Sequence, residues 1–267
     1  MVDALRSYLL LAGTWTRSAA QYPVSMVLLL VAQALSTSLD LAAILIMFAH
    51  TPRLGGFSLP EVMFLYGTSG VAISVADITL GSVERLGEHI REGSLDALLL
   101  RPVSPLVQIA TEDFNPRRLG KLVPTVTVLS VSLARLDVHW TPARVATIPL
   151  MLAGGIGIFW GLWVLSAAWQ FAVVDGRQAA NSITYGGGFL TQYPLSIFGR
   201  EVVRVLTWML PLAFVNWEPA LYVLGRPDPL GLPLVFRFVS PIVAAALCLL
   251  AALAWRTGLR HYQSTGS

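Results

Sequence analysis

The stretch "VSMVLLLVAQALSTSLDLAAILIMF", residues 24 to 48, carries only one charged side chain, that of Asp40. An α-helix rises about 1.5 Å per residue, so a run of this length covers the roughly 30 Å of hydrocarbon in a bilayer. The core of a soluble protein does not need apolar sequence arranged in runs this long. The stretch therefore predicts a membrane-spanning helix.

The composition of the whole chain indicates the same class. Of 267 residues, 55% are hydrophobic and 12% are charged, against about 25% charged in an ordinary soluble domain. The mean hydropathy is +0.67. The basic residues are scattered between apolar runs and form no stripe, which argues against a nucleic-acid partner. The single cysteine, Cys248, lies in an apolar run, so we expect neither a disulfide framework nor a metal site.

We therefore predict an all-α membrane protein with an amphipathic helix at the membrane interface over residues 1–22. Between residues 174 and 233 two apolar segments occur, and either or both could cross. A single crossing there places 11 of the 18 basic residues on one side, which the positive-inside rule assigns to the cytoplasm together with both termini. The other predicted spans cover residues 24–48, 61–83, 120–136, 145–173 and 234–255.

One charged interval interrupts the apolar sequence: "HIREGSLDALLLRPVSPLVQIATEDFNPRRLGK", residues 89–121. Ser94 is the predicted N-cap of a short helix that Pro102 ends, and Ser104 begins a second helix that ends before Pro116. A plain connector would be about 2 to 8 residues long. Two short helices with an exposed apolar face suit insertion into the groove of another protein, whereas the alternative is a solvated surface loop.

Motifs for enzymatic chemistry are absent from the sequence. It contains no GxxxxGK[ST], HExxH or GxSxG pattern. No histidine or lysine is predicted in the interior of a span to activate a serine, so we do not expect a catalytic site. The histidines are predicted to be solvated in loops or at helix ends; they are His50, His89, His139 and His261.

Two acidic residues, Asp40 and Asp77, fall inside predicted spans, and no basic partner is predicted in the interior of a span. Ionisable groups within the bilayer are costly and must face protein or water. A role in helix packing is favoured for both, and an ion-coupled secondary transporter that uses them is an alternative.

The residues "REGSLDALLLRPVSP" resemble the stretch that follows the second span in permeases of ABC-2-type exporters, including a bacterial and archaeal subgroup once known only as a domain of unknown function. In that family the stretch forms the coupling region that contacts the ATPase subunit, which implies this role for residues 88–114. The residues that match the pattern are Glu92, Gly93, Ser94, Asp96, Leu98, Leu99, Pro102, Val103 and Ser104. The coupling residues that the resemblance implies are Glu88, Arg91, Glu92, Gly93, Ser94, Asp96, Leu98, Leu99, Arg101 and Pro102.

A second stretch, "QYPLSIFGREVVRVLTWMLPLAFVNWEPALYVL" (residues 192–224), is similar to the external gate of the same family. Gly199 departs from the pattern, because proline is common at that position. The resemblance implies that residues 181–197 form span five and that 198–225 form external re-entrant helices. The implied gate residues are Pro194, Ser196, Arg200, Pro211, Glu218 and Pro219.

The resemblance implies a permease subunit of a drug or lipid exporter in the bacterial plasma membrane. Its expected partners are a second permease, identical or a sister, two ABC ATPase subunits and membrane lipid. The chain itself would hold no cofactor, since ATP and Mg²⁺ would bind to the ATPases. A membrane scaffold that recruits a soluble partner is the other alternative. The expected pathway-lining residues, between spans one, two and five, are Tyr66, Trp163, Tyr185, Phe189 and Tyr193.

Overall fold

A computed structural model describes residues 2–112, 118–173 and 176–263. These residues form helices and loops without a β-strand, which confirms the all-α class. The helices are α1 (Val2–Ala20), α2 (Pro23–His50), α3 (Leu59–Leu80), η1 (Gly81–Arg85), α4 (Leu86–Arg91), α5 (Ser94–Leu99), α6 (Pro105–Thr111), α7 (Leu119–Arg135), α8 (Pro142–Gln170), α9 (Arg177–Asn181), the π-helix η3 (Ser182–Gly186), α10 (Gly187–Leu190), η4 (Leu195–Ile197), α11 (Arg200–Trp208), η5 (Leu212–Phe214), α12 (Trp217–Leu224), η6 (Leu234–Phe238) and α13 (Ser240–His261).

Four helical segments are long and apolar enough to cross a bilayer: Pro23–His50, Leu59–Arg91, Pro142–Gln170 and Ser240–His261. The other two predicted spans differ from these. The helix at 120–136, α7, has 17 residues. The segment 181–197 is not one continuous helix, because a π-helix, a short α-helix, a turn and a 3₁₀ helix follow one another. A run of three glycines in this segment weakens its helical preference. The six-span arrangement stays a prediction.

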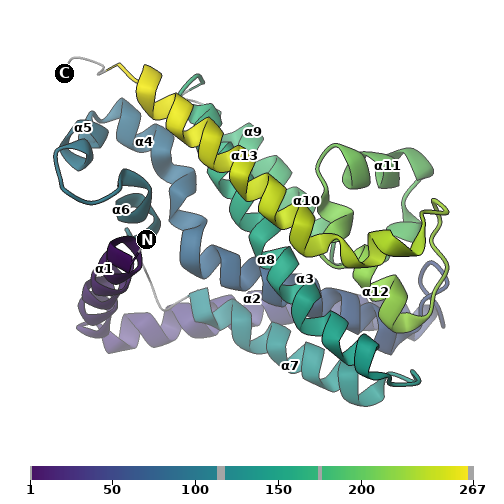
Figure 1. Ribbon diagram of the computed structural model, residues 1–267. Helices are drawn as coiled ribbons and strands as arrows, with labels where there is room; N and C mark the ends of the chain where they lie inside the picture. Colours follow the sequence, from purple (N-terminus) through teal and green to yellow (C-terminus); the bar gives the residue numbers. More distant parts are fainter. Residues whose placement is uncertain (1, 113–117, 174–175, 264–267) are drawn as a thin grey trace.

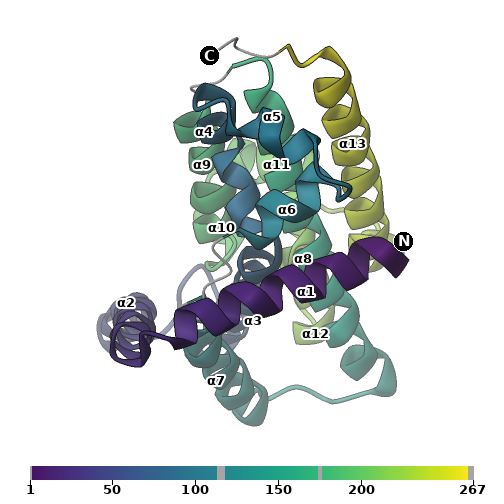
Figure 2. The ribbon, with the colours of Figure 1, turned by 90° about the vertical axis from the view of Figure 1, so that its left-hand side faces the viewer.

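The elements gather at two ends of the molecule (Figure 1). Helices α1, α4, α5 and α6 and the C-terminal end of α13 lie at one end, which we call the terminal end. The segment 51–58 and helices α11 and α12 lie at the opposite end, which we call the loop end. Figure 2 looks onto the terminal end and shows α1 lying across it in front of α3.

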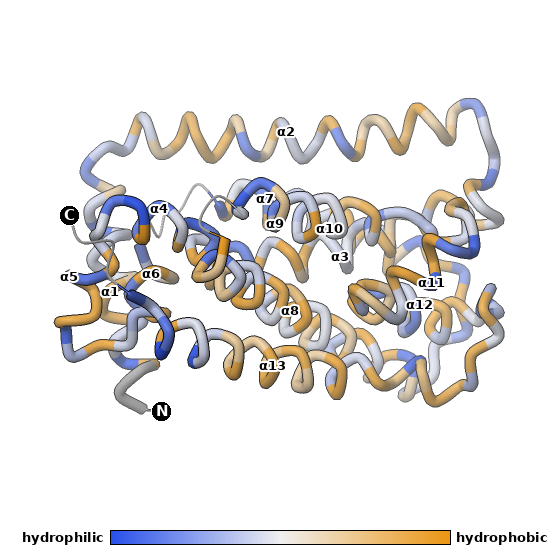
Figure 3. The backbone as a smooth tube through the Cα atoms, turned by 90° about the horizontal axis from the view of Figure 1, so that it is seen from above, coloured by the Kyte–Doolittle hydropathy of each residue, from blue (hydrophilic) through white to orange (hydrophobic). Residues whose placement is uncertain are grey.

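Helix α2 stands apart from the other long helices (Figure 3). Only Thr37 and Ile44 of its 28 residues are buried, and its neighbours are α7 and α1. A helix that is apolar on all sides and has so few partners in its own chain must be covered by lipid or by another protein.

The centre of the fold is the buried helix α3, which packs on α7 and α8. Helices α3 and α7 approach closely because Gly67 has no side chain. A Cβ on Gly67 would lie 2.8 Å from the backbone of Leu129. Small residues also let α8 and α13 meet, since a Cβ on Gly157 would lie 2.8 Å from that of Ala244. Close backbone approach at glycine is typical of helix pairs in membranes.

A second, smaller core lies at the terminal end. Leu86 and Ile90 of α4, Leu95 of α5 and Ile109 of α6 are buried in it. Residues of α8 and α13, among them Trp255, complete this core. The short helices of the charged interval are therefore packed on the ends of two long helices.

Candidate functional site

The charged interval folds as two short helices, α5 and α6, as the sequence predicted. The N-cap of α5 is Gly93 and not Ser94. Gly93 has φ 68°, a left-handed conformation that glycine adopts without strain, and this lets the chain turn sharply from α4 into α5. The hydroxyl of Ser94 instead lies 2.8 Å from Nδ1 of His89. The predicted break at Asn115–Pro116 lies outside the described residues, as do positions 113 and 114 of the coupling region.

His89 is not a solvated loop residue, which corrects the expectation from the sequence. It lies in α4 with a side chain that is 12% exposed, and its Nε2 is 2.6 Å from Oε2 of Glu112. This hydrogen bond holds the pKa of the Glu112 carboxyl below its usual value, although burial of the group acts in the opposite direction. The pair joins the end of α6 to α4.

The leucines of α5 divide between the inside and the surface. Leu95 is fully buried and Leu98 packs partly against the second core. Leu99 is 43% exposed and the next residue, Leu100, is 88% exposed. Four other residues of the coupling region are also exposed; they are Arg91, Glu92, Arg101 and Pro102. We call Leu99 and Leu100 together with these four exposed residues the docking corner.

Two glutamine side chains fix the docking corner to the rest of the chain. Gln108 Nε2 donates hydrogen bonds to the carbonyl oxygens of Leu98 and Val103, at 2.9 and 2.8 Å, and so holds the α5–α6 turn. Gln170, at the end of α8, accepts from the Gly87 N–H at 2.7 Å and donates to the Glu84 carbonyl at 3.0 Å. Movement of α4 is thereby tied to α8.

Two other predicted coupling residues face the protein. The Glu88 carboxylate pairs with the Arg177 guanidinium of α9, which also reaches Glu84 at 3.4 Å. Asp96, in the first turn of α5, is half-buried. Glu88 therefore joins the coupling region to the start of α9.

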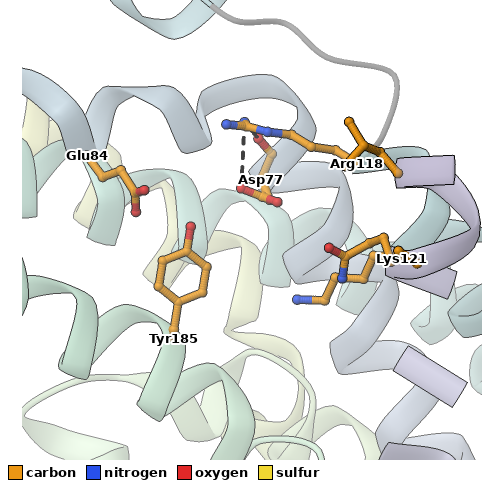
Figure 4. Close-up of a pocket in the computed structure, with 8 residues that line it drawn as sticks. Asp77, Glu84, Arg118, Lys121 and Tyr185 are labelled. Atoms are coloured by element: carbon orange, nitrogen blue, oxygen red, sulfur yellow. Dashed lines mark hydrogen bonds and ion pairs between the residues drawn. The ribbon is translucent and has the colours of Figure 1, made fainter. Parts of the chain in front are cut away.

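A chamber of about 470 Å³ lies between α2, α3, α7 and the π-helix near the terminal end. Figure 4 shows the Lys121 ammonium and the Tyr185 hydroxyl reaching into the same space. The chamber is lined by Leu29, Ala32, Gln33, Asp77, Glu84, Arg118, Lys121 and Tyr185. Several converging polar groups in one concave space are typical of a binding site.

Asp77 has a basic partner, which the sequence did not predict. The Arg118 Nη1 lies 3.6 Å from Asp77 Oδ1, and Arg118 also donates to the Asp77 carbonyl and to the Ser82 hydroxyl. Arg118 lies just before the predicted span 120–136, so the sequence assigns it to the cytoplasmic loop and not to the membrane. Lys121 lies one turn further along, within α7.

The five aromatic residues predicted to line a pathway have different environments. Tyr66 and Trp163 are buried, and the Tyr66 hydroxyl donates to the Thr37 carbonyl at 3.0 Å. Tyr185 lines the chamber. Phe189 is 49% exposed and its ring centroid lies 5.3 Å from that of Tyr193. Only Tyr185, Phe189 and Tyr193 reach an open surface in the single chain.

The predicted gate residues lie around the loop end. The Ser196 hydroxyl donates to the Gly55 carbonyl at 2.9 Å, while Arg200 is exposed at the start of α11. Glu218 is fully buried, and its Oε2 lies 3.4 Å from Nε of Arg237. Pro194 and Pro219 are buried and Pro211 is half-buried between α11 and α12.

The family model described as "ABC-2 family transporter protein" matches residues 34–266. The chain belongs to the ABC-2 transporter family. The family implies a multi-pass membrane permease of an ABC transporter, a component that is not itself catalytic and that works with ABC ATPases. Neither a curated protein nor a solved structure shows significant similarity to this permease.

Sequence reasoning missed an ion pair at the loop end of the permease. The Glu61 carboxylate accepts from Nε and Nη2 of Arg226, each at 2.9 Å, and from the backbone N–H of Ser58 at 2.7 Å. The guanidinium of Arg226 also lies 5.4 Å from the ring centroid of Phe57. The pattern of serine followed three residues later by glutamate, a capping box, is the signal that could have located Glu61.

Asp40 and Asp77 are not brought into one site in this permease. Asp77 lines the chamber, whereas Asp40 is exposed on α2 and is not part of the chamber lining. Among the described residues no group of three or more His, Cys, Asp or Glu side chains could hold a metal ion.

Proposed function

We propose that this chain is the permease subunit of an ATP-driven exporter, which docks a separate ABC ATPase through the docking corner. The observation that carries the proposal is the nearly complete exposure of Leu100 on a helix pair that is otherwise firmly packed. Burying a leucine side chain is worth about 1.5 to 3 kcal/mol. An exposed apolar anchor with a charged rim suits a groove on a partner protein.

The packing of the docking corner supports a role in transmitting force. The second core and the Gln170 hydrogen bonds join α4, α5 and α6 to α8 and α13. Closure of two ATPases around ATP and Mg²⁺ would push residues 88–114 as one body. That push would shift α8 and reopen the spans outward, a rigid-body motion of the kind that couples distant sites.

The proposal includes six spans with both termini in the cytoplasm and a re-entrant gate over residues 198–225. The position of α11 and α12 together at the loop end supports a segment that enters from one side and returns. The poorly covered α2 supports pairing with a second permease, identical or a sister. The cargo would pass between spans one, two and five of the pair.

The docking proposal is tested by co-expressing the permease with its ABC ATPase and measuring how much ATPase co-purifies. Leu99→Asp/Leu100→Asp should reduce recovery by at least about tenfold, since each 1.4 kcal/mol of lost burial weakens binding about tenfold. Leu234→Asp is the matched control, because Leu234 is 64% exposed at the opposite end. Normal recovery with the double variant, at normal permease expression, would contradict the proposal.

The two alternatives predict other results in the same preparation. A scaffold would retain the ATPase without stimulating ATP hydrolysis in lipid. A secondary transporter that uses Asp40 and Asp77 would move cargo without the ATPase. The Arg118 partner of Asp77 favours a structural role for that acid.

A further inference from the structure

The chamber contains a cation, the Lys121 ammonium, that no described residue neutralises by direct contact. The lining carboxylates are each matched by an arginine: Asp77 by Arg118 and Glu84 by Arg177. The Lys121 ammonium makes no hydrogen bond or ion pair with any described residue, and Asp77 and Asp40 act on it only over a longer distance. Partial burial of an ammonium is costly unless a charged group pairs with it, so a bound anion would stabilise Lys121 in this position.

Polar side chains that can form hydrogen bonds lie on the neighbouring walls of the chamber. Gln33 of α2 lines the same chamber as Lys121 and Tyr185, and the last two are labelled in Figure 4. The walls are apolar at Leu29 and Ala32 of α2, and both side chains have exposed surface in the single chain. The chamber therefore combines the Lys121 ammonium, which has no ion-pair partner among the described residues, and polar hydrogen-bonding groups with an apolar wall.

We propose that the chamber binds the anionic headgroup of an amphiphile, a phosphate or a carboxylate, with Lys121 as its charge partner. Lysine binds such groups as a point charge, and the Gln33 amide can donate to a remaining oxygen. Leu29 and Ala32 would contact the first apolar part of the bound molecule. This inference names the substrate class of the proposed pathway and so rests on the proposed function, since the chamber lies between the helices expected to line it.

The test uses the full-length chain in a non-ionic detergent and measures lipid binding by native mass spectrometry. Phosphatidylglycerol is compared with phosphatidylcholine of the same acyl chains. We expect the wild-type permease to bind phosphatidylglycerol at least about tenfold more tightly, as a charge-assisted hydrogen bond requires. Lys121→Gln should abolish this preference, whereas Lys121→Arg should keep it.

Arg135→Gln is the matched control, because Arg135 is exposed at the other end of α7. Inorganic phosphate, added as a competitor, distinguishes the sources of the anion. Displacement of the lipid by phosphate would show that a free anion suffices, and resistance to phosphate would show that the acyl chains contribute to binding. Equal binding of the two lipids, or an unchanged preference in Lys121→Gln, would overturn the proposal. Because the chain is tested without the ATPase, failure here is distinguishable from failure of docking.

Discussion

Gln170 is the residue on which the coupling of α4 to α8 depends most. Gln170→Leu would remove the side-chain partner of the buried Gly87 N–H and of the Glu84 carbonyl. Each such group costs about 1 to 3 kcal/mol. We expect a lower melting temperature in detergent and a loss of ATPase stimulation by the permease. Gln178→Leu, at an exposed position of α9, should leave both values unchanged; equal behaviour of the two variants would contradict this role.

Glu218 predicts a pH dependence at the loop end. Burial raises the pKa of its carboxyl from the usual 4.5 to about 7; Asp228 adds to the shift and Arg237 opposes it. Between these two pH values Glu218 keeps its proton in the folded chain and has released it in the unfolded chain. The free energy of unfolding therefore falls as the pH rises. The melting temperature should therefore fall between about pH 5 and pH 7, and the fall should be smaller in Glu218→Gln.

Glu201→Gln is the control for this measurement, since Glu201 has an 82% exposed side chain on α11. The same slope of melting temperature against pH in wild type and Glu218→Gln would rule out Glu218 as the group responsible.

Single residues were predicted well where local sequence determines their role. Pro102 follows the end of α5 and Ser104 is the N-cap residue of α6, because proline restricts the backbone within a few residues, whereas the N-cap of α5 is Gly93 and not the predicted Ser94. Partners far apart in sequence were not predicted. Arg118 with Asp77 and Arg226 with Glu61 are separated by 41 and 165 residues, and only the packing of helices brings them together.

The pairing of α3 with α7 depends on a backbone contact that allows no adjustment by side chains. Gly67→Ala would place a Cβ 2.8 Å from both N and Cα of Leu129. Overpacking of this kind costs about 1 to 3 kcal/mol. We expect a lower melting temperature in detergent, whereas Gly13→Ala should be tolerated, because nothing lies within 4 Å of that position. A Gly67→Ala chain as stable as wild type would show that the two helices can separate without cost.

The positions of the long helices were predicted from the length of the apolar runs in the sequence. Helices α2, α3, α8 and α13 include most of the residues predicted for their spans, since long apolar runs give a strong signal. The segment 181–197 was harder to predict. Its three glycines and its polar residues give no clear period. Its helical part packs closely on α3, since a Cβ on Gly188 of α10 would lie 2.5 Å from Cδ1 of Ile73.

The docking corner and the proposed gate, residues 198–225, lie at opposite ends of the permease. Cysteines introduced by Leu100→Cys and Leu234→Cys, in a Cys248→Ser chain, should react with impermeant maleimide from opposite sides of the membrane. We expect Leu100→Cys to react only from the cytoplasm, as the bias of basic residues requires. Reaction of both cysteines from one side would remove the six-span arrangement and the gate with it.

The most direct test of the account is the rate at which a cysteine at position 100 is labelled with and without the ATPase. The cytoplasmic face of the membrane is exposed to maleimide, first with the permease alone and then with its co-expressed ABC ATPase bound. If the docking corner receives the ATPase, binding should slow labelling of Leu100→Cys by at least about tenfold, because an 88% exposed side chain becomes buried. An unchanged rate with the ATPase bound would contradict the account.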